Sequence, residues 1–188
     1  MSAGSISSAR MADGFDLDMY RVATTGERRG TLVLLQEIFG LTEHIREMCD
    51  GFALDGFDVL SPSLFDREEP GLQATYEPAD IARCVEIARE RHPFEKTVED
   101  VRDTVALAKA GAPVFVLGYC YGGSAAWAAA CRIPGITAVA SYYGSHVNRM
   151  VTETPRCPVI LHFGERDAGI PPEDVAKLRE YRRQGQLG

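Results

Sequence analysis

The residues best suited to chemistry stand in one short stretch, GYCYGG. A thiol, Cys120, lies between Gly118 and Gly122, directly after the apolar run 113–118 and before the small-residue segment 124–132. This is the strand–turn–helix setting of the nucleophile elbow, with cysteine in place of serine. Because the nucleophile's backbone is strained in such a turn, the residues two positions away must be small. The pattern therefore predicts a nucleophilic thiol, and the alternative is a buried cysteine in a glycine-rich turn.

The helix expected over 124–132 also affects this thiol. Its N-terminus directs a partial positive charge and free N–H groups at Cys120, which favours the thiolate and stabilises an oxyanion. The odd number of cysteines and the lack of any CxxC motif argue against a disulfide framework or a zinc site, and they fit a reducing cytoplasm. We expect Cys120 to be the most reactive of the five cysteines; the others are Cys49, Cys84, Cys131 and Cys157.

Short apolar runs alternate with longer amphipathic segments along the rest of the chain. The first kind predicts buried strands, and the second predicts helices. Their alternation is typical of an α/β fold with a mostly parallel sheet, helices on both faces, and the functional site at the carboxyl ends of the strands. The predicted strands are 31–36, 57–62, 113–118, 136–144 and 158–164, and the predicted helices are 42–57, 78–91, 95–110, 124–132 and 171–185, with a loop over 63–76.

The composition indicates a single globular domain and argues against some classes of partner. The chain has 188 residues, 45% of them hydrophobic, which is enough for one domain with a core. Its 20 basic and 27 acidic residues give a net charge of −7, which argues against nucleic acid as the main partner. No apolar run approaches the ~20 residues of a membrane span, and the N-terminus carries no secretory signal. We predict a cytoplasmic protein with a flexible N-terminal tail over 1–14 and a single domain over 15–188.

Several stretches together resemble one family. GYCYGG and QEIFG (36–40) are similar to motifs of the dienelactone hydrolases, which have the α/β-hydrolase fold. The stretches 55–65, 141–144 and 162–171 extend the resemblance, which covers the chain from about residue 15 to 180. The resemblance implies a hydrolase that cleaves a small lactone or ester through a thioester on its cysteine, without cofactor or metal.

The resemblance also implies a role for individual residues. Cys120 matches the family's nucleophile, Asp167 the acid of its triad, and Glu37 the glutamate beside the thiol. The oxyanion hole would consist of the backbone N–H groups of Ile38 and Tyr121. A substrate carboxylate would need an arginine, for which we expect Arg83 first and Arg67 second.

The pattern breaks at the histidine of the triad. The family's histidine lies roughly 30 residues after the acid, beyond another strand, whereas none of the residues after Asp167 is histidine. We therefore expect a fold that lacks the last strand, the histidine loop and the closing helix. His162 is expected to be structural, His146 is a weak substitute, and His44 and His92 are expected on helix surfaces or ends.

Two accounts of this break remain open. The chain is either a C-terminally shortened relative of an active hydrolase, which the intact motifs favour, or an inactive small-molecule-binding protein on the same fold. A third function, redox sensing through Cys120, is also compatible with an exposed thiol of low pKa. The sequence leaves the substrate and the oligomeric state open.

Overall fold

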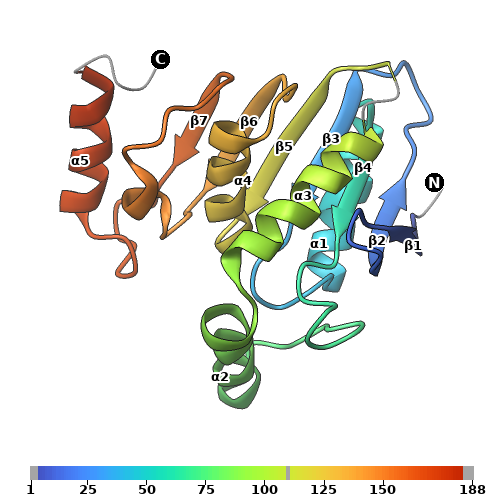
Figure 1. Cartoon of the computed structure of the whole chain (residues 1–188), viewed down its shortest axis with the longest axis horizontal. Helices are drawn as coiled ribbons and strands as arrows, with labels where there is room; N and C mark the ends of the chain where they lie inside the picture. The colour runs from blue at the N-terminus through green and yellow to red at the C-terminus, as the bar shows by residue number, and fades with distance from the viewer. Residues whose placement is uncertain (1–3, 109–110, 184–188) are drawn as a thin grey trace.

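A seven-stranded sheet organises the residues that the computed structural model describes, which are 4–108 and 111–183 (Figure 1). The strand order is β1-β2-β4-β3-β5-β6-β7. The strands are β1 Ser5–Arg10, β2 Asp16–Val22, β3 Gly30–Leu35, β4 Phe57–Pro62, β5 Val114–Tyr119, β6 Ala138–Tyr142 and β7 Val159–His162. The helices are α1 Glu43–Leu54, α2 Pro78–Glu86, α3 Phe94–Ala108, α4 Tyr121–Arg132 and α5 Pro172–Arg183, with a π-helical turn η1 over Ile87–Arg91 and a 3-10 helix η2 over Val147–Met150.

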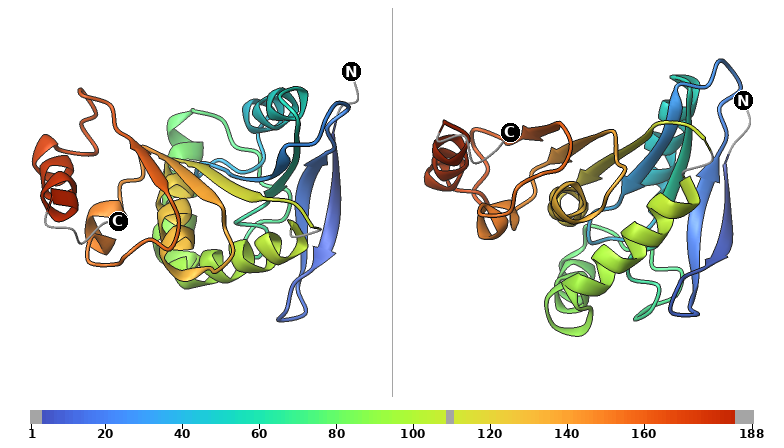
Figure 2. Two further views of the ribbon diagram at one scale, coloured as in Figure 1. Left: turned by 90° about the horizontal axis from the view of Figure 1, so that it is seen from above. Right: turned by 45° about the horizontal axis from the view of Figure 1, so that its top comes forward.

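Five neighbouring strands, β4, β3, β5, β6 and β7, are parallel, and β1 and β2 are antiparallel additions at the edge next to β4. Every residue of β3 is buried, as expected of a strand covered on both faces. Leu32 and Leu34 pack with α1 on one face, whereas Val33 and Leu35 pack with α3 and α4 on the other (Figure 2). The predicted mostly parallel sheet with helices on both faces is thereby confirmed.

The predicted elements are also confirmed, with small differences at their ends. The segment predicted as one helix over 78–91 is α2 followed by η1, and it ends at His92 before Pro93. The Thr42 side chain accepts a hydrogen bond from the Ile45 N–H and so caps α1. Positions 109–110 and 184–185 of two predicted helices lie outside the described residues.

The predicted flexible tail over 1–14 is wrong for the residues that the structure describes. Ser5–Arg10 is strand β1, and all six of its residues pair with β2. Backbone ladder bonds hold this strand, so its small polar side chains need no core contact. The turn after β1 is fixed as well, because the Ala12 N–H donates to an Asp103 oxygen at 2.7 Å.

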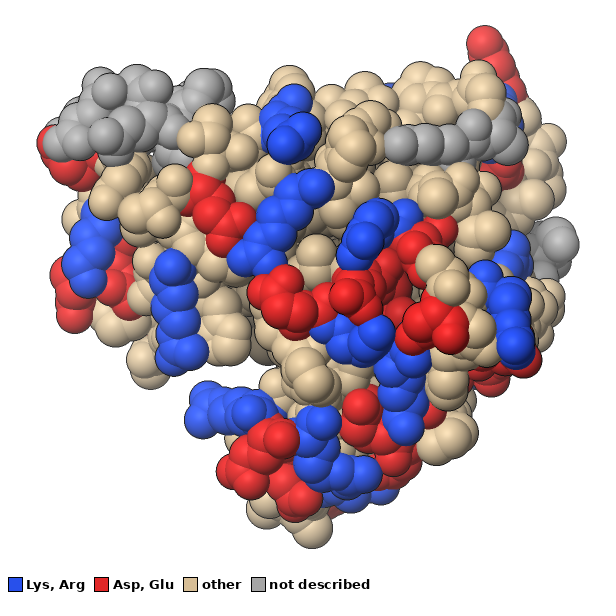
Figure 3. Space-filling view, in the orientation of Figure 1, with Lys and Arg blue, Asp and Glu red and all other residues tan. Residues whose placement is uncertain are grey.

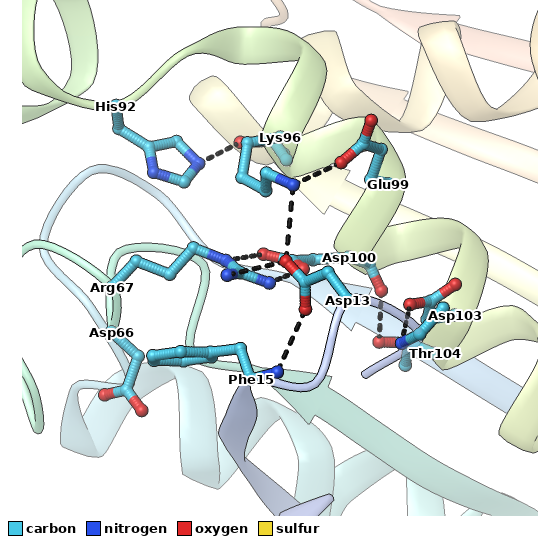
Figure 4. A network of polar contacts seen from close by, with 12 residues as sticks. Asp13, Phe15, Asp66, Arg67, His92, Lys96, Glu99, Asp100, Asp103 and Thr104 are labelled. Atoms are coloured by element: carbon cyan, nitrogen blue, oxygen red, sulfur yellow. Dashed lines mark hydrogen bonds and ion pairs between the residues drawn. The ribbon is translucent and has the colours of Figure 1, made fainter. Parts of the chain in front are cut away.

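An ion-pair network anchors the same turn (Figure 4). The Arg67 guanidinium lies 2.9 Å from Asp13 and 2.7 Å from the buried carboxylate of Asp100. It also lies over the Phe15 ring, 4.3 Å from its centroid. Lys96 bridges Asp13 to a carboxylate on α3. The N-terminal hairpin is therefore part of the folded domain rather than a tail.

The opposite edge of the sheet is open. β7 pairs only with β6 among the described strands, no strand follows it in residues 163–183, and Ile160 is 54% exposed. A groove of about 730 Å³ lies between β7 and α5, lined by Trp127, Leu161, Phe163 and Leu178 among others. This edge agrees with the expected lack of a last strand.

Candidate active site

The thiol of Cys120 stands at the sharp turn between β5 and α4. Its backbone has φ 55° and ψ −114°, a strained conformation for a residue with a side chain. A Cβ added at Gly118 would lie 2.0 Å from the carbonyl oxygen of Gly122, and one added at Gly122 would lie 2.4 Å from that of Leu35. No larger residue fits either position without moving the backbone, which is the steric requirement that the sequence predicts.

Neighbouring strands hold the elbow in place. The Cys120 N–H donates to the Tyr142 carbonyl at the end of β6 at 2.9 Å, and the Gly122 N–H donates to the Gln36 carbonyl after β3 at 3.0 Å. The alanines of α4 are fully buried, which lets this helix lie directly on the sheet. The backbone around the thiol is therefore fixed from both sides.

Glu37 follows β3 at the same edge of the sheet, next to the elbow. One carboxylate oxygen accepts a hydrogen bond from the Tyr143 hydroxyl at 2.9 Å, and the other accepts one from the Tyr76 hydroxyl at 3.4 Å. Tyr143 itself is strained, with φ 41°. The sequence analysis assigned no role to either tyrosine, although Tyr143 lies in the SYYG stretch that carries the resemblance. Two phenols thus orient the carboxylate beside Cys120.

The charges and the burial around the thiol oppose its ionisation. Burial raises the pKa of Cys120, the backbone N–H of Tyr121 lowers it, and the charges of Glu37 and Asp167 raise it further, with a net upward shift. The helix N-terminus was predicted to favour the thiolate, and the N–H of Tyr121 does lower the pKa of Cys120, but burial outweighs it. The surroundings of the thiol therefore oppose its ionisation on balance.

Asp167 lies in the loop after β7, at the same edge of the sheet. Its charge acts on Cys120, but its Oδ1 accepts a hydrogen bond from the Gly169 N–H within its own loop at 2.8 Å. None of the four histidines, all within the described residues, has a recorded contact with it. Asp167 as the acid of a triad therefore stays a prediction, and no described histidine lies in position for it to orient.

The histidines occupy other positions. His162 stacks on Tyr142, with centroids 4.2 Å apart, as a structural residue would. His146 contacts Phe94 by its ring, and burial together with the charges of Arg149 and Arg89 lowers its pKa. His44 is exposed on α1.

His92 lies at a helix end, as predicted, because it is the C-cap of η1. Its side chain is fully buried. Both ring nitrogens have partners, Glu68 on Nδ1 and Thr97 on Nε2. The proline that follows it indicated only the helix end, and no sequence signal indicated the burial.

The predicted substrate arginines are both engaged by carboxylates. Arg83 pairs with Glu69 and, at 2.9 Å, with Asp80, and Arg67 belongs to the network that anchors the N-terminal turn. Basic and acidic side chains are interspersed over α2 and α3 on the face shown in Figure 3. The role of Arg83 in binding substrate therefore stays a prediction, and its contacts with two carboxylates do not support it.

The part of the chain that the structure describes holds no group of three or more histidine, cysteine or acidic side chains placed to bind a metal ion. Nor is any described helix long and apolar enough to cross a membrane. The cytoplasmic location stays a prediction.

A cysteine at a strained strand–helix elbow, on a mostly parallel sheet covered on both faces, defines an α/β-hydrolase fold. A solved structure titled "Putative Dienelactone Hydrolase", from Klebsiella pneumoniae, has this fold with a TM-score of 0.84 at 23% identity, over 98% of this chain and 81% of that one. The chain belongs to the dienelactone hydrolase family, whose model matches residues 17–187.

Curated relatives agree with this assignment. A protein of Salmonella typhimurium named "Putative carboxymethylenebutenolidase" is 26% identical over 96% of this chain and 70% of its own length. YczH of Bacillus subtilis, named as uncharacterized, is 30% identical over 82% of this chain and 72% of its own length. A Synechocystis relative with the carboxymethylenebutenolidase name is matched over 66% of its length. Family membership places the chain among hydrolases, and the two carboxymethylenebutenolidase names agree with it.

Proposed function

We propose that the chain is a thiol hydrolase that cleaves a small lactone or carboxylic ester through a thioester on Cys120. The observation that carries the proposal is the strained elbow, at which the Tyr121 N–H and the charge of Glu37 both act on the thiol. Backbone strain of this kind clusters at functional sites. Family membership also favours the hydrolase over that alternative.

The first half of the reaction uses the groups proposed around the elbow. Glu37 accepts the thiol proton, and the resulting thiolate attacks the carbonyl carbon of the substrate. The backbone N–H groups of Tyr121 and Ile38 stabilise the oxyanion. Collapse of this intermediate breaks the bond to the leaving oxygen, which takes the proton from Glu37, and leaves a thioester on Cys120.

The second half requires water to be activated against the thioester. Asp167 would orient a histidine for this step, and no histidine contacts it among the described residues. We therefore propose that the 188-residue chain acylates readily and deacylates slowly. The acyl-enzyme should accumulate, which makes it the species to measure.

The test is mass spectrometry of the intact chain after brief incubation with p-nitrophenyl acetate. We expect one acetyl group on Cys120, and no such adduct in Cys120→Ala. Cys157→Ala is the matched control, because Cys157 is the other cysteine that is only partly buried, and this variant should acylate like the parent chain.

Two results would contradict the proposal. An adduct on Cys157 rather than Cys120 would show that the elbow does not activate its thiol. A Cys120 that is never acylated but is oxidised reversibly by mild peroxide would favour redox sensing instead.

A further inference from the structure

A continuous line of buried polar groups ends at the residue next to the nucleophile. The Glu68 carboxylate lies 2.7 Å from Nδ1 of His92, and Nε2 of His92 lies 2.9 Å from the Thr97 hydroxyl. The Thr97 hydroxyl in turn lies 2.7 Å from the Tyr121 hydroxyl. We call these four residues the Glu68–Tyr121 relay. It connects the loop over 63–76 to the first residue of α4, and Figure 4 shows His92 close to the Arg67 network.

Three of the four relay residues are sealed from water. The side chain of His92 is 0% exposed and Thr97 and Tyr121 are buried, while Glu68 is 15% exposed at the outer end. Phe65 packs against the rings of both His92 and Tyr121, with centroids 5.3 Å and 5.0 Å away. Burying this many polar groups is costly unless each is hydrogen-bonded, so the contacts must form together.

One assignment of the protons satisfies all the partners. With Glu68 ionised and His92 neutral, Nδ1 of His92 carries the proton and donates to the carboxylate, which leaves Nε2 as an acceptor. Thr97 then donates to Nε2 and accepts from the Tyr121 hydroxyl. Each donor has one acceptor, and all three hydrogen bonds point in the same direction. Because both ring nitrogens are occupied, His92 acts through Thr97 rather than on a substrate.

Tyr121 connects the relay to Cys120 and to the proposed oxyanion hole. Its backbone N–H acts on the Cys120 sulfur and is one of the two proposed oxyanion donors. Its side chain is held at the hydroxyl by Thr97 and on the ring by Phe65 and Phe94. Because these contacts fix the side chain of Tyr121, its backbone N–H has little freedom to turn away. A preorganised donor is the main requirement of an oxyanion hole.

We propose that Glu68, His92 and Thr97 are positioning residues that hold the Tyr121 N–H in line with the oxyanion of the acylation step. This inference rests on the proposed thiol hydrolase function. It extends that function from the thiol to a set of residues on the loop over 63–76, at the end of η1 and at the start of α3, none of which touches the substrate.

The test compares two reactions of the same thiol in the full chain. Acylation by p-nitrophenyl acetate passes through an oxyanion, whereas alkylation by iodoacetamide does not. Thr97→Val keeps the shape of the side chain and removes the hydroxyl that joins His92 to Tyr121. We expect it to slow the acylation step about tenfold, a fraction of the loss caused by deleting an oxyanion donor outright. The limiting alkylation rate at high pH should stay unchanged.

Matched variants separate positioning from general damage. Thr97→Ser retains the hydroxyl and should acylate like the parent chain. Tyr121→Phe removes the same hydrogen bond from the other side, so it should reproduce the loss, and the double variant should lose no more than either single one. Tyr121→Phe also tests the inference should Thr97→Val fail to fold.

The outcomes distinguish this inference from the proposed function. If the parent chain forms the thioester and neither Thr97→Val nor Tyr121→Phe slows it, the relay has no positioning role although the hydrolase proposal stands. Equal losses in acylation and limiting alkylation would likewise overturn the inference, because they indicate general disruption of the elbow. If the parent chain is never acylated on Cys120, the proposed function fails and the relay has no oxyanion to serve.

Discussion

The elbow at Cys120 and the loop at Asp167 end parallel strands at the same edge of the sheet, but they are built differently. Most of the elbow is buried, and its N–H groups donate to carbonyls at the ends of β3 and β6. In the Asp167 loop most residues are exposed, and the carboxylate accepts its hydrogen bond from Gly169, two residues further along. Contacts with other strands therefore hold the elbow, whereas the Asp167 loop is held mainly by contacts within the loop.

The two halves of the proposed reaction depend on different regions of the fold. The groups for attack on the substrate are all on elements from β3 to α4, which pack in the core of the sheet. The group for clearing the thioester would have to be oriented by Asp167, which lies beyond β7 at the open edge. Acylation therefore depends on the better fixed region, and deacylation on the less fixed one.

The largest expected effect comes from completing the second region. We predict that a fused C-terminal segment of roughly 40–60 residues, carrying a strand, a histidine loop and a helix, raises kcat for ester turnover by on the order of 10⁴. The strand would pair with β7, where Ile160 is exposed, and so also raise the thermal midpoint. Steady-state turnover and thermal denaturation of both forms provide the measurements.

A control separates the two consequences of this fusion. Replacing the added histidine with alanine should remove the gain in turnover and keep the gain in stability. If the 188-residue form already turns over esters as fast as the fused form, an internal residue such as His146 or Glu37 is the base.

The next effect compares a glycine from each region. A Cβ at Gly122 would lie 2.4 Å from the carbonyl oxygen of Leu35, whereas a Cβ at Gly164 would meet Asp167 at 3.6 Å, an ordinary contact. We expect Gly122→Ala to lower the free energy of unfolding by about 3 kcal/mol or more. Gly164→Ala should change it by less than about 1 kcal/mol. Urea denaturation measures both, and similar losses would mean that the two regions are equally constrained.

The elbow could be predicted from sequence because its constraints are local. Gly118 is required by the Gly122 carbonyl in the same turn, and strand and helix patterns flank both glycines, although the carbonyl that requires Gly122 belongs to Leu35, far away in sequence. The apolar strands and amphipathic helices were predictable for the same reason, since periodicity along the chain reports which face is buried.

The features that were missed depend on partners distant in sequence. β1 carries small polar side chains, and it is a strand only because β2 pairs with it. The burial of His92 results from Glu68 and Thr97, which reach it from a loop and a helix. Tyr76 and Tyr143 meet at Glu37 from opposite parts of the chain. The raised pKa of Cys120 likewise depends on burial, which the motif does not report.

The smallest expected effect concerns the two carboxylates that act on the thiol, one from each region. Both raise the pKa of Cys120, and Glu37 raises it more than Asp167 does. Removing either charge should lower that pKa, so the rate of iodoacetamide alkylation should begin to rise at a lower pH. We expect the larger displacement in Glu37→Gln and the smaller one in Asp167→Asn.

Only one of the two variants should change the rate when acylation is measured instead. Glu37→Gln increases the thiolate fraction at a given pH but removes the acceptor of the thiol proton, so alkylation becomes faster while acylation by p-nitrophenyl acetate becomes slower. Asp167→Asn removes no group that the first half of the reaction uses, so its acylation rate should remain close to that of the parent chain. Should Asp167→Asn displace the alkylation profile more than Glu37→Gln does, the Asp167 loop is coupled to the thiol more tightly than the elbow's own neighbour. It would then be wrong to assign acylation to the elbow and deacylation to the Asp167 loop.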